Sequence, residues 1–375
     1  MNQTDLTEID LATTIQATAL ATLLESSTLP HKVGRYLGVL SPLELDAPEQ
    51  ETAAFLSEAA IHDLGWVKRV AVHGADRFRW LSGMVTNTVD ELGAHNGAWN
   101  LVLNAQGRVQ GDLAVWREGE ELELAITANQ YERLMAHLEH FIIMDDVELV
   151  PLSAETAIGL TGPKADEVLA RLSMPTLSEP LTGTRVEWNG LDLRILRGYG
   201  VLAPHYELWV PVAGIGKLWL GLRTAAATPV GSTAVEAFRI AEGIPAYGID
   251  IAEKDLAQET SQMRALHFNK GCYLGQEVVE RIRSRGNVHK HLRQLELSGP
   301  VPAGGTELQF DDGALDGETA AGHITSAASL ALPAGSRVFA LGMMRGDAEA
   351  RNQTLQYSVG TEKGTAKILS DPAVL

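Results

Sequence analysis

The chain has 375 residues, 45% of them hydrophobic and 21% charged, a composition typical of a globular protein with two or three domains. Its formal net charge of −18 disfavours broad binding to DNA or other phosphate backbones, and no apolar run is long enough to cross a membrane as a helix. The single cysteine excludes an intrachain disulfide and a four-cysteine metal site within one chain, and it is typical of a protein of the reducing cytoplasm.

The first part of the chain is acidic. It has no basic region ahead of an apolar stretch, so neither a signal peptide nor an arginine-rich transit peptide is expected. Apolar residues recur at helical intervals over residues 11–25, which predicts a helix there. We therefore expect residues 1–60 to form an acidic, partly helical leader, to which the sequence assigns no function.

Two successive segments then repeat one order of elements: strand, helix, strands, helix and strand. The first unit is expected over residues 61–155 and the second over residues 156–290. Because short turns join neighbouring strands, the pattern predicts a duplicated α+β architecture with antiparallel sheets of ferredoxin-like type. The predicted elements are residues 66–73, 75–84, 98–103, 109–116, 122–127, 130–141 and 147–151, and then residues 157–160, 163–172, 185–188, 191–196, 206–212 and 214–227.

The last part of the chain, residues 291–375, has a different sequence pattern, in which short segments typical of β-strands are separated by Gly, Pro and Asp. The strands are expected at residues 292–297, 307–310, 321–326 and 337–341. This spacing predicts a small all-β barrel or sandwich.

Residues 270–277, with the sequence KGCYLGQE, carry the strongest chemical signal. Lys270 offers a cation, and Tyr273 offers a stacking face with a hydroxyl group. Gln276 and Glu277 offer hydrogen-bonding groups to the amide-like edge of a heterocycle. The segment therefore predicts a site for a flat, polar, partly anionic ligand.

Cys272 lies between Lys270 and several arginines, and nearby positive charge favours the thiolate form. We therefore consider it a candidate reactive or redox-active thiol, although the alternative of a small buried hydrophobic residue stays open.

Between residues 270 and 293 six bases outnumber two acids, which favours an anionic ligand, while the alternative is a solvated helix face. These bases are Lys270, Arg281, Arg283, Arg285, Lys290 and Arg293.

The segment 270–277 resembles the signature of the folate-binding YgfZ family, which is related to the glycine-cleavage T-protein (aminomethyltransferase) superfamily. Four further places resemble motifs of that family, and the resemblance runs from about residue 60 to the C-terminus. These places are residues 83–87, 103–109, 239–245 and, together, 285–286 with 322–326.

The resemblance implies three domains around a central hole that holds tetrahydrofolate or a derivative, with a C-terminal β-barrel. It also implies a role in the assembly or repair of iron–sulfur enzymes, including a cluster-dependent tRNA-modifying one, with these enzymes as partners. Polyglutamylated folate tails would be drawn to the basic residues around Arg285. The expected folate-binding residues are Lys270, Tyr273, Gln276, Glu277, Arg239, Asp112 and Arg285, and the expected reactive groups are Cys272 and Asp112.

Two departures from the transferase pattern bear on catalysis. Transferases of the superfamily carry an Asp-Asp pair where this chain has Gly111 and Asp112, and Ala241 stands where they place a glutamate, with Glu242 one position later. Both departures favour folate binding without aminomethyl transfer, although a folate-dependent aminomethyltransferase or demethylase stays the alternative. A noncatalytic interaction module is a third hypothesis. The histidines show no metal-binding spacing, so no metal is expected.

Overall fold

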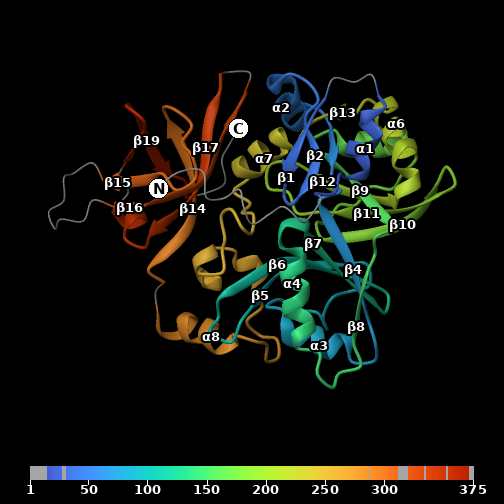
Figure 1. The fold of residues 1–375 in the computed structure, drawn as a ribbon, viewed down its shortest axis with the longest axis horizontal. Coiled ribbons are helices and arrows are strands. Elements are labelled where there is room, and N and C mark those ends of the chain that lie inside the picture. The colour runs from blue at the N-terminus through green and yellow to red at the C-terminus, as the bar shows by residue number, and fades with distance from the viewer. Residues whose placement is uncertain are drawn as a thin grey trace.

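The fold is described from a computed structural model of the chain. The structure describes residues 15–27, 31–286, 288–310, 320–332, 335–351 and 354–370. These residues form two mainly antiparallel sheets with their helices, a short N-terminal hairpin and a closed barrel. In Figure 1 the barrel lies to one side of the two sheets, and the six-stranded sheet lies above the five-stranded one.

The five-stranded sheet has the strand order β5-β6-β7-β4-β8 and is covered by two helices. Its strands are β4 (Val67–His73), β5 (Gly97–Leu103), β6 (Val109–Glu118), β7 (Glu121–Thr127) and β8 (Glu148–Pro151), and its helices are α3 (Arg77–Met84) and α4 (Ala128–His140). Leu134 and Leu138, one turn apart on α4, are fully buried against the sheet, as the amphipathic pattern of this segment predicts. The predicted order of elements in this unit is confirmed.

The six-stranded sheet has the order β10-β11-β12-β9-β3-β13. Its strands are β3 (Ala60–Asp63), β9 (Glu155–Thr161), β10 (Thr182–Trp188), β11 (Leu191–Arg197), β12 (His205–Pro211) and β13 (Thr228–Pro229), and its helices are α5 (Ala165–Arg171) and α6 (Ile215–Thr224). Strand β13 pairs with β3 in parallel, whereas the other pairs are antiparallel. The predicted strands and helices of this unit are present, with β3 and β13 added at one edge.

Much of the expected leader is part of the folded core. It contains α1 (Ala19–Glu25), a hairpin of β1 (Lys32–Tyr36) and β2 (Val39–Glu44), and α2 (Pro48–Ser57), and the strand β3 begins at its last residue. The observed helix α1 covers the second half of the predicted helix over residues 11–25, and residues 11–14 lie outside the described ranges. Leu20 and Leu24 of α1 pack into the core of the six-stranded sheet, so this region stabilises the fold.

The closed barrel has the order β14-β17-β16-β15-β18-β19, which confirms the predicted barrel. Its elements are β14 (Lys290–Ser298), β15 (Glu307–Phe310), β16 (Ala320–Leu330), β17 (Arg337–Arg345), α9 (Ala348–Arg351), β18 (Leu355–Val359) and β19 (Glu362–Ile368). Between the sheets and the barrel lie α7 (Ser232–Ala241), the 3-10 turns Ala257–Thr260 and Met263–Ala265, and α8 (Gln276–Arg285). Helix α7 packs against the barrel through Ile240 and Phe339.

The two sheets meet through both apolar and charged side chains. Trp116 of β6 and Trp209 of β12 share one buried cluster. Beside them, Arg69 Nη1 lies 2.5 Å from Glu155 Oε2, and Arg194 Nη1 lies 2.5 Å from Glu123 Oε2. Ion pairs buried in this way fix the relative position of the two sheets, because breaking one leaves an uncompensated charge.

Candidate functional site

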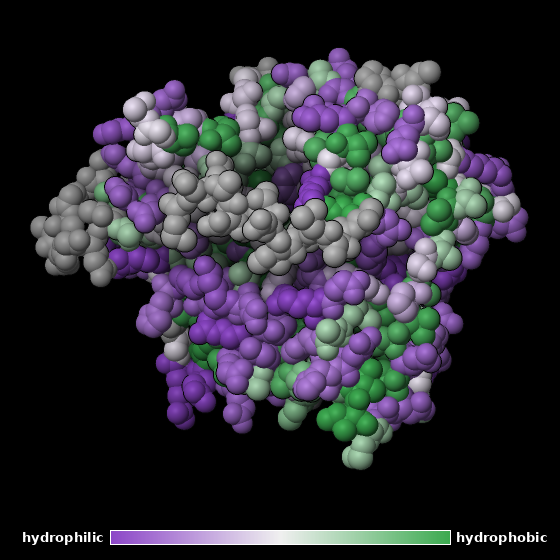
Figure 2. Space-filling view, in the orientation of Figure 1, coloured by the Kyte–Doolittle hydropathy of each residue, from purple (hydrophilic) through white to green (hydrophobic). Residues whose placement is uncertain are grey.

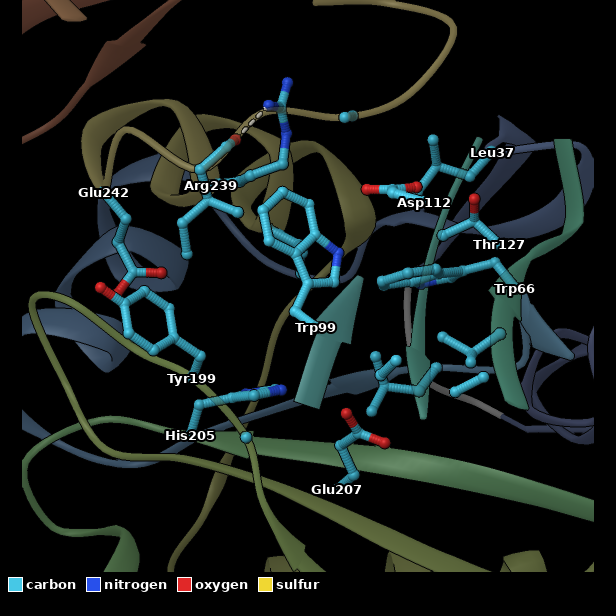
Figure 3. Close-up of a pocket in the computed structure, with 18 of the residues that line it drawn as sticks. Leu37, Trp66, Trp99, Asp112, Thr127, Tyr199, His205, Glu207, Arg239 and Glu242 are labelled. Atoms are coloured by element: carbon cyan, nitrogen blue, oxygen red, sulfur yellow. Dashed lines mark hydrogen bonds between the residues drawn. The ribbon is translucent and has the colours of Figure 1, made fainter. Parts of the chain in front are cut away.

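A cavity of about 460 Å³ lies between the two sheets, with α7 and the segment 242–247 along one side (Figure 3). This volume is in the range of small-molecule sites, roughly 300–1,000 Å³. Strands β6, β7 and β12 supply walls, and Leu37 in the turn between β1 and β2 also lines the cavity. Its polar and aromatic lining residues include Tyr36, His62, Trp66, Trp99, Asp112, Trp116, Thr127, Gln130, Thr161, Tyr199, His205, Glu207, Arg239, Glu242, Tyr247 and Arg264.

One wall combines aromatic rings with a cation. The Arg264 guanidinium lies 4.8 Å from the ring centroid of Trp99 and 3.7 Å from that of Tyr199. Within the described part of the chain, Nε of Arg264 is buried without a hydrogen-bond partner. Burial lowers the pKa of Arg264, but an arginine keeps its charge in proteins. The wall therefore presents a cation stacked between two aromatic rings.

Three acidic side chains reach the cavity, and burial raises the pKa of each. Asp112 accepts a hydrogen bond from Gln130 Nε2 at 2.7 Å. Glu207 accepts one from Trp209 Nε1 at 2.9 Å. Glu242 accepts two, from the backbone amides of Val201 and Leu202 at 2.8 and 2.9 Å. Each carboxyl group is thus held in place by neighbouring donors while it faces the cavity. Figure 3 shows Asp112, Glu207 and Glu242 on different sides of Trp99.

Two of the residues predicted from sequence, Asp112 and Arg239, line this cavity. Arg239 Nη1 donates to the carbonyl oxygen of Ile244 at 2.5 Å and pairs with Asp250 Oδ2 at 2.7 Å. Glu236 holds the other edge of the same guanidinium. Arg239 therefore shapes the cavity wall, and its charge is already compensated by protein groups.

The segment 270–277 lies elsewhere, since none of its residues lines the cavity. Lys270 Nζ donates to the carbonyl oxygens of Ser82 and Val85 at 2.8 Å each and of Asn87 at 2.6 Å. These carbonyls are at the C-terminal end of α3 and just beyond it, where backbone acceptors lack helical partners. Lys270 therefore fixes the end of a helix, a structural role that the sequence pattern did not reveal.

The rest of the segment docks α8 onto the turn between β5 and β6. Gly275 has φ +83°, and a Cβ there would lie 2.6 Å from the carbonyl oxygen of Asn104, so only glycine fits the contact.

Tyr273 is buried, whereas Cys272, Glu277 and Arg285 are exposed. The alternative that the cysteine is a buried hydrophobic residue is therefore wrong. Hydrophilic side chains cover the region of α8 in Figure 2.

Replacing Lys270 with methionine is expected to lower the free energy of unfolding by about 1–3 kcal/mol, because three carbonyl groups lose their donor. Burial lowers the pKa of Lys270 to about 8, so the side chain is still mainly protonated at neutral pH. Urea denaturation would measure the loss, with exposed Lys254→Met as the matched control. Unchanged stability of the Lys270 variant would contradict the capping role.

Several cavity residues were missed by the sequence reasoning, namely Trp99, Tyr199, His205, Glu207 and Arg264. A signal did exist for two of them. His205 and Glu207 are two positions apart on β12, so they lie on the same face of a strand whose other residues are mostly buried and apolar. Polar side chains that share one face of such a strand indicate a functional surface.

The fold is that of the glycine-cleavage T protein. The crystal structure of aminomethyltransferase T of the glycine cleavage system from Bartonella henselae superposes with a TM-score of 0.85, covering 96% of this chain and 98% of that one at 20% identity. The family described as the GCVT N-terminal domain matches residues 36–270, more than half of the chain. The protein therefore belongs to the GCVT family. The match starts well before residue 60, in agreement with the folded state of that region.

Two relatives show the breadth of this family. The aminomethyltransferase of Thermoanaerobacter sp. (strain X514) is 24% identical over 293 residues, which are 74% of this chain and 78% of that protein. The tRNA-modifying protein YgfZ of Yersinia pseudotuberculosis is 26% identical over 256 residues, 65% of this chain and 73% of that protein. Within the described ranges, no helix has the length and apolar character needed to cross a membrane.

Proposed function

We propose that this protein binds tetrahydrofolate or a derivative in the cavity between its two sheets. The observation that carries the proposal is the combination, in one cavity, of aromatic walls, buried carboxyl groups and the stacked guanidinium of Arg264. A pterin is flat and presents amino and ring N–H donors, which match aromatic faces and carboxylate acceptors. A folate also carries carboxylates, which match the guanidinium of Arg264.

Binding without group transfer is supported by the surroundings of position 111. A Cβ on Gly111 would lie 2.7 Å from Gln130 Oε1, and that Gln130 also holds Asp112. A second acid at position 111 would therefore displace the residue that orients the first. Aminomethyl transfer needs a charged group at the reacting nitrogen, and one carboxyl group of the transferase pair is missing.

Aminomethyl transfer is the second candidate, and one observation favours it. Glu242, one position after the place of the transferase glutamate, lines the cavity together with Asp112. Two carboxyl groups thus face the ligand space, as acid–base chemistry on a folate nitrogen requires. Incubation with an aminomethyl donor and tetrahydrofolate should yield methylenetetrahydrofolate if this candidate is correct. No product across a panel of donors would support binding alone.

Tetrahydrofolate titration, followed by tryptophan fluorescence, tests the proposed function directly. Trp66, Trp99 and Trp116 line the cavity, so a bound pterin should quench their emission in a saturable way. Arg264→Met should weaken binding, because it removes the cation from the aromatic wall. Arg223→Met is the matched control, since Arg223 is exposed on α6 and does not line the cavity. A titration without saturation would refute the proposal.

The cellular role that we propose is support of iron–sulfur enzymes, including tRNA modification. The likeness to the YgfZ protein of Yersinia pseudotuberculosis supports the role, and the exposed thiol of Cys272 is accessible to a partner or an oxidant. The exposed arginines of α8 would attract the polyglutamate tail of a folate. A strain carrying Cys272→Ala should lose cluster-dependent tRNA modification under oxidative stress, and full modification would exclude the thiol from this role.

A further inference from the structure

A chain of three polar side chains runs from the core of the six-stranded sheet into the cavity. His62 Nδ1 lies 3.1 Å from the carbonyl oxygen of Asp63, and His62 Nε2 lies 3.2 Å from Thr161 Oγ1. The same Thr161 oxygen lies 2.7 Å from His205 Nδ1. The two imidazole rings stack with centroids 5.9 Å apart and an interplanar angle of 12°. Both histidines and Thr161 line the cavity.

The positions of the protons follow from hydrogen-bond rules. A carbonyl oxygen only accepts, so Nδ1 of His62 must carry hydrogen, which leaves Nε2 of a neutral His62 as an acceptor. The single hydroxyl hydrogen of Thr161 then points to His62, and the Thr161 oxygen accepts hydrogen from Nδ1 of His205. In this arrangement each of the three contacts holds one hydrogen. The remaining ring nitrogen, Nε2 of His205, has none.

Both rings are neutral at physiological pH. Burial lowers the pKa of His62 to about 4 and that of His205 to about 3, with the neighbouring His62 contributing to the second shift. Within the described residues, no group donates to Nε2 of His205, whose ring extends into the cavity beside Glu207 in Figure 3. The free nitrogen therefore presents a lone pair to the ligand space.

Two glycines make room for the rings. A Cβ on Gly159 would lie 2.1 Å from Cε1 of His62, and a Cβ on Gly198 would lie 2.4 Å from Cδ2 of His205. Real Cβ atoms do not approach ring atoms so closely, so the imidazoles sit where glycine alone leaves space. The chain of side chains is thus a built feature of the cavity wall and restricts rotation of both rings.

We propose that His205, held in one tautomer by Thr161 and His62, is a specificity residue whose bare Nε2 accepts a hydrogen bond from a ring N–H of the ligand and so selects reduced over oxidised pterins. The inference rests on the proposed function, because it assigns the ligand's oxidation state in the same cavity. Tetrahydrofolate carries hydrogen on both saturated-ring nitrogens. Folic acid carries a lone pair on each, which would face the lone pair of His205.

The first test needs no ligand. A long-range ¹H–¹⁵N correlation spectrum at neutral pH, with His205→Gln used for assignment, shows which ring nitrogen of His205 carries hydrogen. We expect hydrogen on Nδ1 and none on Nε2. Hydrogen on Nε2 would overturn the inference whether or not folate binds, so its failure is distinguishable from failure of the proposed function.

The second test compares tetrahydrofolate and folic acid by equilibrium titration. The wild type should prefer tetrahydrofolate by about tenfold or more, since two facing acceptors cost at least one hydrogen bond. His205→Leu should lose this preference, whereas His205→Gln should retain part of it, because the amide oxygen can still accept a hydrogen bond. Thr161→Val should reduce the preference, because the hydroxyl that holds His205 in one tautomer is gone. His140→Leu, an exposed histidine outside the cavity, is the control.

An equal preference in the wild type and in the His205→Leu protein would overturn the assigned role. If neither folate form binds the wild type, the proposed function fails together with the ligand assignment made here. A melting curve for each variant confirms that the compared proteins are folded. Thr161→Val provides an independent readout if His205→Leu does not fold, because the ring at position 205 is then unchanged.

Discussion

Replacing Asp250 with alanine is expected to lower the free energy of unfolding by about 3–5 kcal/mol, because it removes one of the two carboxylates that pair with the buried Arg239 and also the acceptor of the buried Ser326 hydroxyl. The Asp250 side chain is fully buried and pairs with Arg239 at 2.7 Å through Oδ2. Its other oxygen, Oδ1, accepts from Thr325 and Ser326 of β16 at 2.6 Å each. One carboxylate thus joins α7 to the barrel. Urea denaturation followed by circular dichroism would measure the loss.

The control for this prediction is a surface ion pair with the same residue types. Asp192 lies 3.2 Å from Arg185, and its side chain is 67% exposed. Removal of Asp192 should change stability by no more than about 1 kcal/mol, because solvent screens an exposed pair. Equal losses for Asp250→Ala and Asp192→Ala would show that the contact between α7 and the barrel contributes little to stability.

The sequence predicted the regular elements well where local pattern determines them. Strand β6 and helix α4 show clear alternation and helical periodicity, and both are observed close to the expected ranges. The strand β3 was missed because Ala60–Asp63 is short and owes its place to pairing with β9, a partner about a hundred residues away. Such pairing leaves no periodic signal in the local sequence.

The candidate site was harder to predict, because a segment rich in ligand-like side chains can serve the fold. The segment 270–277 contains ligand-like side chains, yet Lys270 binds backbone carbonyls at the end of α3 and Gly275 docks against the turn at Asn104. The cavity instead joins residues from many distant elements, such as Asp112, Glu207 and Arg264. Only the tertiary arrangement of the two sheets brings these side chains together.

Replacing Glu207 with glutamine is expected to weaken tetrahydrofolate binding by about tenfold to more than a hundredfold, the equivalent of about 1.5–3 kcal/mol for a hydrogen bond to a charged group. The amide presents an NH₂ group where the carboxylate would accept a hydrogen bond from the ligand. Its oxygen can still accept the hydrogen bond from Trp209 Nε1, so the fold should persist. Isothermal titration would measure both affinities, with the exposed Glu187→Gln on β10 as control. An affinity within twofold of the wild type would exclude Glu207 from the ligand contact.

The pH dependence of binding provides an internal check on the role of Glu207. Burial raises the pKa of Glu207, so on acidification this carboxylate takes up its proton at a higher pH than an ordinary glutamate. Protonation removes the negative acceptor, and wild-type affinity should therefore fall as the pH decreases through that raised pKa. Glutamine does not titrate, so the Glu207→Gln protein should lose this part of the pH dependence. Parallel pH profiles for the two proteins would place the titrating group elsewhere in the cavity, with Asp112 and Glu242 as the carboxyl groups to replace next.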